Sequence, residues 1–167
     1  MSTLAAVPEM TASAPALQLE LTRVIKAARP RVFDAWTRPE IIRQWFAPEG
    51  MVTTAAETNP VEGGAYGLAF QGTMKDSAAA RPNQSVDHKA SVRGMYTKVE
   101  PFDLIQFTWE AEWSAGESSL VTIHFREVEG GTEIRLVHER FASVQSRDGH
   151  AIGWNGCLAH LDAFLSN

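Results

Sequence analysis

Hydrophobic and polar residues alternate along several stretches of the chain, which is the pattern of strands with one buried face. The clearest stretch is Leu104–Trp113, where Ile, Phe and Trp at every second position oppose Gln, Thr and Glu. Weaker alternation predicts a first strand at Leu17–Val24. Further strands are predicted at Met51–Thr58, Ala65–Gln71, His88–Val99, Leu120–Val128 and Thr132–Glu139. Short turns join the later strands, which predicts an antiparallel meander.

Two other segments follow helical spacing. Between Ala28 and Phe46, Pro30 and Pro39 each precede a short apolar pattern, which predicts two short helices. From about Gln145 to Leu165 the period is helical again and predicts one long C-terminal helix. Its apolar stripe consists of Trp154, Leu158, Leu161 and Leu165.

The remaining segments are rich in small residues and breakers. Residues 1–15 predict a disordered leader, so we expect a single domain over residues 16–167. The low hydrophobicity of Gly72–Asp87 predicts a long loop, either a functional lid or a tolerated insertion. The leader lacks the basic and apolar regions of a signal peptide, and no stretch approaches the roughly 20 apolar residues that span a bilayer.

Composition narrows the function further. The 167 residues carry a net charge of −5, which argues against nucleic-acid binding because phosphates require clustered Lys and Arg. Cys157 is the one cysteine, so the chain forms no internal disulfide, and we expect a reducing, cytoplasmic setting. Nucleotide-binding, hydrolase and zinc motifs are absent from the sequence, so we expect neither a cofactor nor a metal.

The order of predicted elements and a set of short motifs resemble bacterial proteins of the type that activates the heat-shock-protein-90 ATPase, within the START-like helix-grip superfamily. The motifs are Arg23-Val24-Ile25, Val32-Phe33-Asp34-Ala35-Trp36-Thr37 with Pro39, Trp45 with Pro48, Gly63-Gly64, Gly94-Met95-Tyr96, Glu100-Pro101, Phe107-Thr108-Trp109, and Gly153-Trp154 with Leu158, Leu161 and Phe164-Leu165. They span the chain from about Leu17 to the C-terminus. None of them is a catalytic signature.

The resemblance implies an α+β helix-grip fold. In this fold a curved antiparallel sheet wraps around a long C-terminal helix, with two short helices after the first strand. It also implies a cavity between the sheet and the C-terminal helix, which relatives use to bind hydrophobic compounds and occasionally for catalysis.

Large aromatic rings supply the candidate lining of that cavity, because rings offer broad apolar surfaces. Trp36 and Trp45 are expected in the core instead. Gly149, Gly153 and Gly156 share one face of the last helix, which predicts either a close approach to the sheet or space for a bound molecule. The predicted ligand-binding residues are Tyr66, Phe70, Tyr96, Phe107, Trp109, Trp113, Ile123, His138, Gly153, Trp154 and Cys157.

Candidate acids and bases are few. His138 and His88 share strand faces with apolar residues and could donate to a ligand or exchange a proton, although a core histidine is the simpler interpretation. Arg23 is in phase with the apolar residues of its strand, so it requires a partner and could bind an anionic group. The charged side chains Glu110, Glu112, Arg126 and Arg135 are expected on the solvated face, and Cys157 as a buried thiol.

Three functions remain open. The leading hypothesis is a protein that binds a small hydrophobic or aromatic molecule. The second is an enzyme of cyclase, dehydratase or hydrolase type in the same cavity, with His138 or His88 as general acid or base. The third is a chaperone partner or stress-response protein that acts through its surface. Exposed sheet edges also allow a homodimer.

Overall fold

The computed structural model describes residues 17–48, 50–73 and 87–166, and for Thr73, Asp87 and His88 the backbone alone. The predicted leader and residues 74–86 of the predicted loop lie outside these ranges, so both stay predictions.

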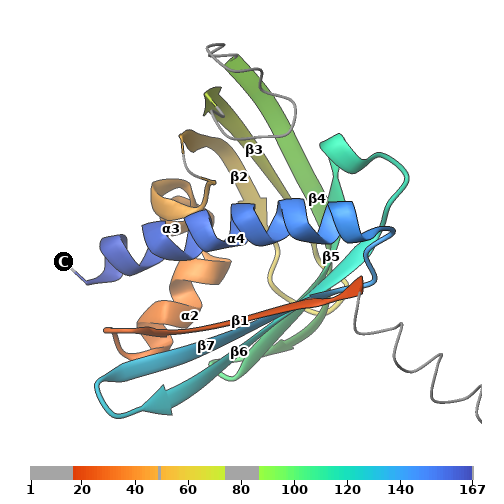
Figure 1. Cartoon of the computed structure of the whole chain (residues 1–167). Coiled ribbons are helices and arrows are strands. Elements are labelled where there is room, and N and C mark those ends of the chain that lie inside the picture. The colour runs from red at the N-terminus through yellow and green to blue at the C-terminus, as the bar shows by residue number, and fades with distance from the viewer. Residues whose placement is uncertain (1–16, 49, 74–86, 167) are drawn as a thin grey trace, which may run out of the picture.

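An antiparallel sheet curls around one long helix (Figure 1). In the described residues the sheet has seven strands in the order β1-β7-β6-β5-β4-β3-β2. Their bounds are β1 Leu19–Ile25, β2 Met51–Thr58, β3 Ala65–Thr73, β4 Asp87–Glu100, β5 Leu104–Ala111, β6 Ser119–Val128 and β7 Gly131–Glu139. Consecutive strands from β2 to β7 are neighbours, so the predicted meander is confirmed.

Two short helices lie between β1 and β2, as predicted. They are α2, Arg29–Thr37, and α3, Pro39–Trp45. A proline is the second residue of α2 and the first residue of α3. Proline is compatible with these positions because the first N–H groups of a helix have no partner within it.

The long helix α4 is Val144–Leu165, one residue longer than predicted. The side chain of its N-cap, Ser143, accepts a hydrogen bond from Ser146 N at 3.0 Å. The predicted apolar stripe, Trp154, Leu158, Leu161 and Leu165, is buried in the core with the inward-facing side chains of the sheet. Together these elements confirm the predicted helix-grip fold. No helix in the described part of the chain is long and apolar enough to cross a membrane.

The outer face of the sheet carries the expected charges. Arg126 pairs with Glu133 at 2.9 Å, and Arg135 pairs with Glu20 at 2.7 Å. These arginines are largely exposed to solvent, so each pair contributes little to stability.

Strand β5 ends earlier than the alternation predicted. The strand stops at Ala111, and the short 3-10 helix η2, Glu112–Ser114, follows. Strand β6 begins at Ser119, opposite Trp109, and the pairing of β4 with β5 extends only to Ala111. Trp113 therefore has no strand partner among the described residues, and its side chain is half exposed, at 50%.

Two of the glycines in α4 do not approach the sheet. A methyl group added at Gly149 or Gly153 would meet no atom of the described residues within 4 Å. Close approach to the sheet is therefore wrong for these two positions, and space for a bound molecule at them stays a prediction.

Candidate functional site

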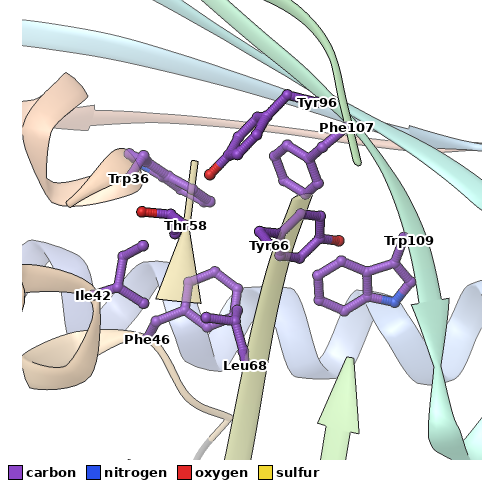
Figure 2. Close-up of a pocket in the computed structure, with 9 residues that line it drawn as sticks. All are labelled: Trp36, Ile42, Phe46, Thr58, Tyr66, Leu68, Tyr96, Phe107 and Trp109. Carbon is purple, nitrogen blue, oxygen red and sulfur yellow. The ribbon is translucent and has the colours of Figure 1, made fainter. Parts of the chain in front are cut away.

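Strands β2 to β5 and the short helices α2 and α3 border a small apolar cavity (Figure 2). Nine of the described residues line it: Trp36, Ile42, Phe46, Thr58, Tyr66, Leu68, Tyr96, Phe107 and Trp109. Its volume is about 20 Å³, enough for about one water molecule. Most of the lining is aliphatic or aromatic, so the surface favours apolar groups.

The cavity lies on the α2–α3 side of the core, which corrects the prediction that it lies between the sheet and α4. None of its lining residues belongs to α4. The buried indole of Trp154 fills the space there, with its ring centroid 5.7 Å from that of Phe46 and 5.0 Å from that of Trp109. Helix α4 thus supports the wall of the cavity from behind.

Polar atoms at the cavity differ in their hydrogen bonding. The Tyr66 hydroxyl donates to the Thr108 carbonyl at 2.6 Å, and Thr58 Oγ1 donates to the Thr37 carbonyl at 2.7 Å. Trp36 Nε1 is buried and has no hydrogen-bond partner among the described residues. Burial raises the pKa of both Tyr66 and Tyr96, so these phenols stay protonated at neutral pH.

A buried histidine lies behind this wall and is bonded on both sides. Trp154 Nε1 donates to His138 Nδ1 at 2.9 Å, so Nδ1 is the unprotonated nitrogen. His138 Nε2 then carries the proton and donates to Ser119 Oγ at 2.7 Å. The Ser119 hydroxyl in turn donates to the Trp109 carbonyl at 3.3 Å.

A second histidine is held in the same way with the roles of helix and sheet exchanged. Trp109 Nε1, on β5, donates to His150 Nε2, on α4, at 3.2 Å. His150 Nδ1 therefore carries the proton and donates to the Ser146 carbonyl at 2.8 Å. The two tryptophan–histidine bonds cross between α4 and the sheet and fix the helix against it.

This bonding gives His138 a structural role. Both ring nitrogens are engaged and its side chain is fully buried, so no ring nitrogen is free to exchange a proton with a ligand. Burial, with a smaller effect of His150, lowers the pKa of His138 to about 2, and the ring is neutral. The side chain of His88 lies outside the described residues, so its predicted role stays a prediction.

Comparison with known proteins decides the family. The sequence profile of the family described as "Activator of Hsp90 ATPase homolog 1-like protein" matches residues 26–166. The chain belongs to this family. No curated protein matches the sequence.

Solved structures of similar fold come from several bacteria. A Chromobacterium violaceum protein has 24% identity and a TM-score of 0.72, with 90% of this chain and 98% of that chain covered. An AHSA1 protein from Silicibacter pomeroyi has 21% identity and a TM-score of 0.72, over 89% and 97% of the two chains. A Mycobacterium smegmatis protein has 20% identity and a TM-score of 0.73, over 91% and 92%. At these identities the likeness shows the fold alone.

Within this member of the Hsp90-activator-like family, the predicted ligand-binding residues separate into groups. Tyr66, Tyr96, Phe107 and Trp109 line the cavity. Ile123, His138, Trp154 and Cys157 are buried but do not line it. Phe70 borders a separate open hollow with Lys89 and Glu112. Gly153 is half-buried, and Trp113 lies against His150 at a ring-centroid distance of 5.8 Å.

Part of the lining comes from the short helices and the first half of the sheet and was not predicted from the sequence. These residues are Trp36, Ile42, Phe46, Thr58 and Leu68. The helical spacing of Trp36 and Ile42 indicated burial, which is correct, since each side chain is 3% exposed. Spacing carries no signal that separates a side chain in dense packing from one beside a cavity.

Two further candidates have simple explanations in the structure. Arg23 is half-buried on the helix-facing side of β1, and its Nη1 lies 3.7 Å from Asp162 Oδ2 on α4. Arg23 therefore has the partner that its position required. Cys157 is buried as predicted, and burial raises the pKa of its thiol to about 12, so the thiol is protonated and unreactive.

Proposed function

We propose that this protein binds a small hydrophobic or aromatic molecule in the cavity bordered by β2–β5 and by α2 and α3. The observation that supports the proposal most directly is the lining itself. Six of the nine residues are aromatic, and these are Trp36, Phe46, Tyr66, Tyr96, Phe107 and Trp109. The aromatic and aliphatic side chains would gain contact area with an apolar guest.

Binding requires the cavity to expand beyond its present size of about 20 Å³. The short helices offer a route for this expansion, since three lining residues come from them. Trp36 lies on α2, Ile42 lies on α3, and Phe46 directly follows α3. A small outward shift of these helices enlarges the cavity without breaking hydrogen bonds between strands. Short helices depend on tertiary packing more than on their own hydrogen bonds, so such a shift has a modest cost.

Native mass spectrometry of the protein purified from its own host tests the proposal first. We expect a stoichiometric adduct that is released on denaturation and can then be identified. A panel of neutral aromatic compounds, titrated while tryptophan fluorescence is recorded, provides the second measurement, because Trp36 and Trp109 line the cavity. An adduct-free mass together with no saturable binding from the panel contradicts the proposal.

A matched pair of variants locates the binding. Leu68→Phe adds volume inside the cavity, whereas Val52→Phe adds a ring on β2 at a position that is 62% exposed and outside the lining. Leu68→Phe should weaken binding at least about tenfold, which corresponds to about 1.4 kcal/mol, while Val52→Phe leaves it unchanged. Equal affinity in the two variants would place the ligand elsewhere.

A further inference from the structure

Two lining side chains, Trp36 and Tyr96, are buried and carry hydrogen-bond donors that bear on the chemistry of a guest. The first is the indole N–H of Trp36, whose side chain is 3% exposed. Other buried tryptophans satisfy the same group: Trp45 Nε1 donates to the Ala35 carbonyl at 2.9 Å, and Trp154 Nε1 donates to His138. A buried donor without a partner is unfavourable, so the exception at Trp36 requires an explanation.

The second donor is the Tyr96 hydroxyl, on a side chain that is also 3% exposed. Figure 2 shows this hydroxyl directed into the space beside Trp36 and Thr58. The Tyr66 hydroxyl, by contrast, points away from that space and donates to the Thr108 carbonyl. The two tyrosines therefore differ in what their hydroxyls do, although their rings line the same cavity.

The lining also restricts the charge of a guest. Its nine described residues carry hydroxyl and indole groups but no carboxylate, amine, guanidinium or imidazole. A charged ligand group would be buried here without an opposite charge. Its burial would cost far more free energy than the burial of a neutral group. The unpartnered indole N–H of Trp36 and the Tyr96 hydroxyl that points into this space favour a guest that offers a lone pair.

We propose that the ligand is a neutral aromatic or aliphatic molecule with a hydrogen-bond acceptor such as a ketone, aldehyde or ether oxygen, which accepts from the Tyr96 hydroxyl and the Trp36 indole N–H. This inference rests on the proposed function and names the chemical class of its ligand. The apolar lining supplies affinity, and the two donors select for the oxygen and orient it.

The test compares two probes of nearly equal shape. Acetophenone has a carbonyl oxygen, and α-methylstyrene has a methylene group in its place. Affinities are measured by tryptophan fluorescence or calorimetry for the wild type, Tyr96→Phe and Trp36→Phe. The preference for acetophenone over α-methylstyrene should fall about threefold to tenfold in Tyr96→Phe and by a similar factor in Trp36→Phe. The comparison of ratios cancels the different solubilities of the probes and any general change of cavity size.

Tyr66→Phe is the matched control, because it also removes a phenolic hydroxyl from the lining but one that is already bonded to a carbonyl. This variant should change both affinities together and keep their ratio. Infrared spectroscopy provides a direct readout: the carbonyl stretch of bound acetophenone should lie at lower frequency in the wild type than in Tyr96→Phe.

The outcomes separate the two proposals. If both probes bind and the ratio is the same in the wild type, Tyr96→Phe and Trp36→Phe, the inferred acceptor is wrong and the proposed apolar site stands. If neither probe nor any compound of the neutral panel binds the folded wild type, the proposed function fails and the inference fails with it.

Discussion

Trp154 and His138 join the long helix to the sheet through one buried hydrogen bond, from Trp154 Nε1 to His138 Nδ1 at 2.9 Å. The bond fixes the tautomer of His138, because a nitrogen that accepts a proton donor's hydrogen bond carries no proton itself. Protonation of Nδ1 would set two N–H groups against each other in a site with no solvent. The neutral ring is thus a condition of the packing between α4 and β7.

This relationship predicts a pH dependence of stability. The pKa of His138 is near 2 in the folded protein, whereas an unfolded histidine titrates near its ordinary value. Below that ordinary value the unfolded chain binds a proton that the folded protein excludes, so stability is lost as the pH falls. Between about pH 7.5 and 5.5 His138 should account for a loss of about 1.4 kcal/mol in the free energy of unfolding.

Denaturant unfolding at the two pH values measures this loss, with His138→Gln as the comparison. The variant carries no titrating group at this position, so its free energy of unfolding should fall by about 1.4 kcal/mol less than that of the wild type. Burial also lowers the pKa of His150, so a remaining dependence on pH is expected in the variant. The same pH dependence in both proteins would show that folding does not lower the pKa of His138.

Ser119 completes the bonding of His138 and gives a second prediction. Ser119→Ala removes the oxygen that accepts from His138 Nε2 and leaves that buried N–H without a partner. The free energy of unfolding should fall by about 1–3 kcal/mol. Its neighbour Ser118 is exposed, so Ser118→Ala should change stability by less than about 0.5 kcal/mol. Equal effects of the two substitutions in chemical denaturation would contradict the assigned bond.

Gly94 on β4 predicts a third result. A methyl group at this position would lie 2.0 Å from the Thr108 carbonyl oxygen and 2.7 Å from the Tyr66 ring, so Gly94→Ala forces β4 and β5 apart. We expect a loss of about 3 kcal/mol. Gly67 on β3 has no atom of the described residues within 4 Å of the same added methyl, and Gly67→Ala should be neutral or slightly stabilising. Thermal unfolding of the two variants checks the contrast, and similar melting temperatures would refute it.

The strands and helices were largely predictable because each has one buried face. A residue's position along a strand or helix determines which face its side chain lies on. The alternation along β5 and the apolar stripe that ends at Leu165 therefore identify the buried faces directly. The error at Trp113 has the same origin. Alternation continues in the sequence after Ala111, but a strand continues only where a neighbouring strand supplies hydrogen bonds, and in the described part of the chain none does so there.

The candidate site was predictable in composition and only partly in place. Tyr66, Tyr96, Phe107 and Trp109 were expected beside the cavity because they alternate on inward faces, and they do line it. Trp154 was expected there as well, from the apolar stripe of the last helix, yet its indole fills the space beside α4. Whether an inward ring borders a void or closes it depends on which other rings arrive from distant parts of the chain.

The sequence by itself determined the order of elements, the buried faces and the apolar character of the interior, because these follow from spacing along one chain. Only the tertiary structure decided which polar atoms of that interior are satisfied. Trp154 reaches His138 and Trp109 reaches His150, while the buried indole N–H of Trp36 has no partner among the described residues. Hydrogen bonds depend on distances of a few tenths of an ångström between segments far apart in sequence, and no local pattern encodes such distances.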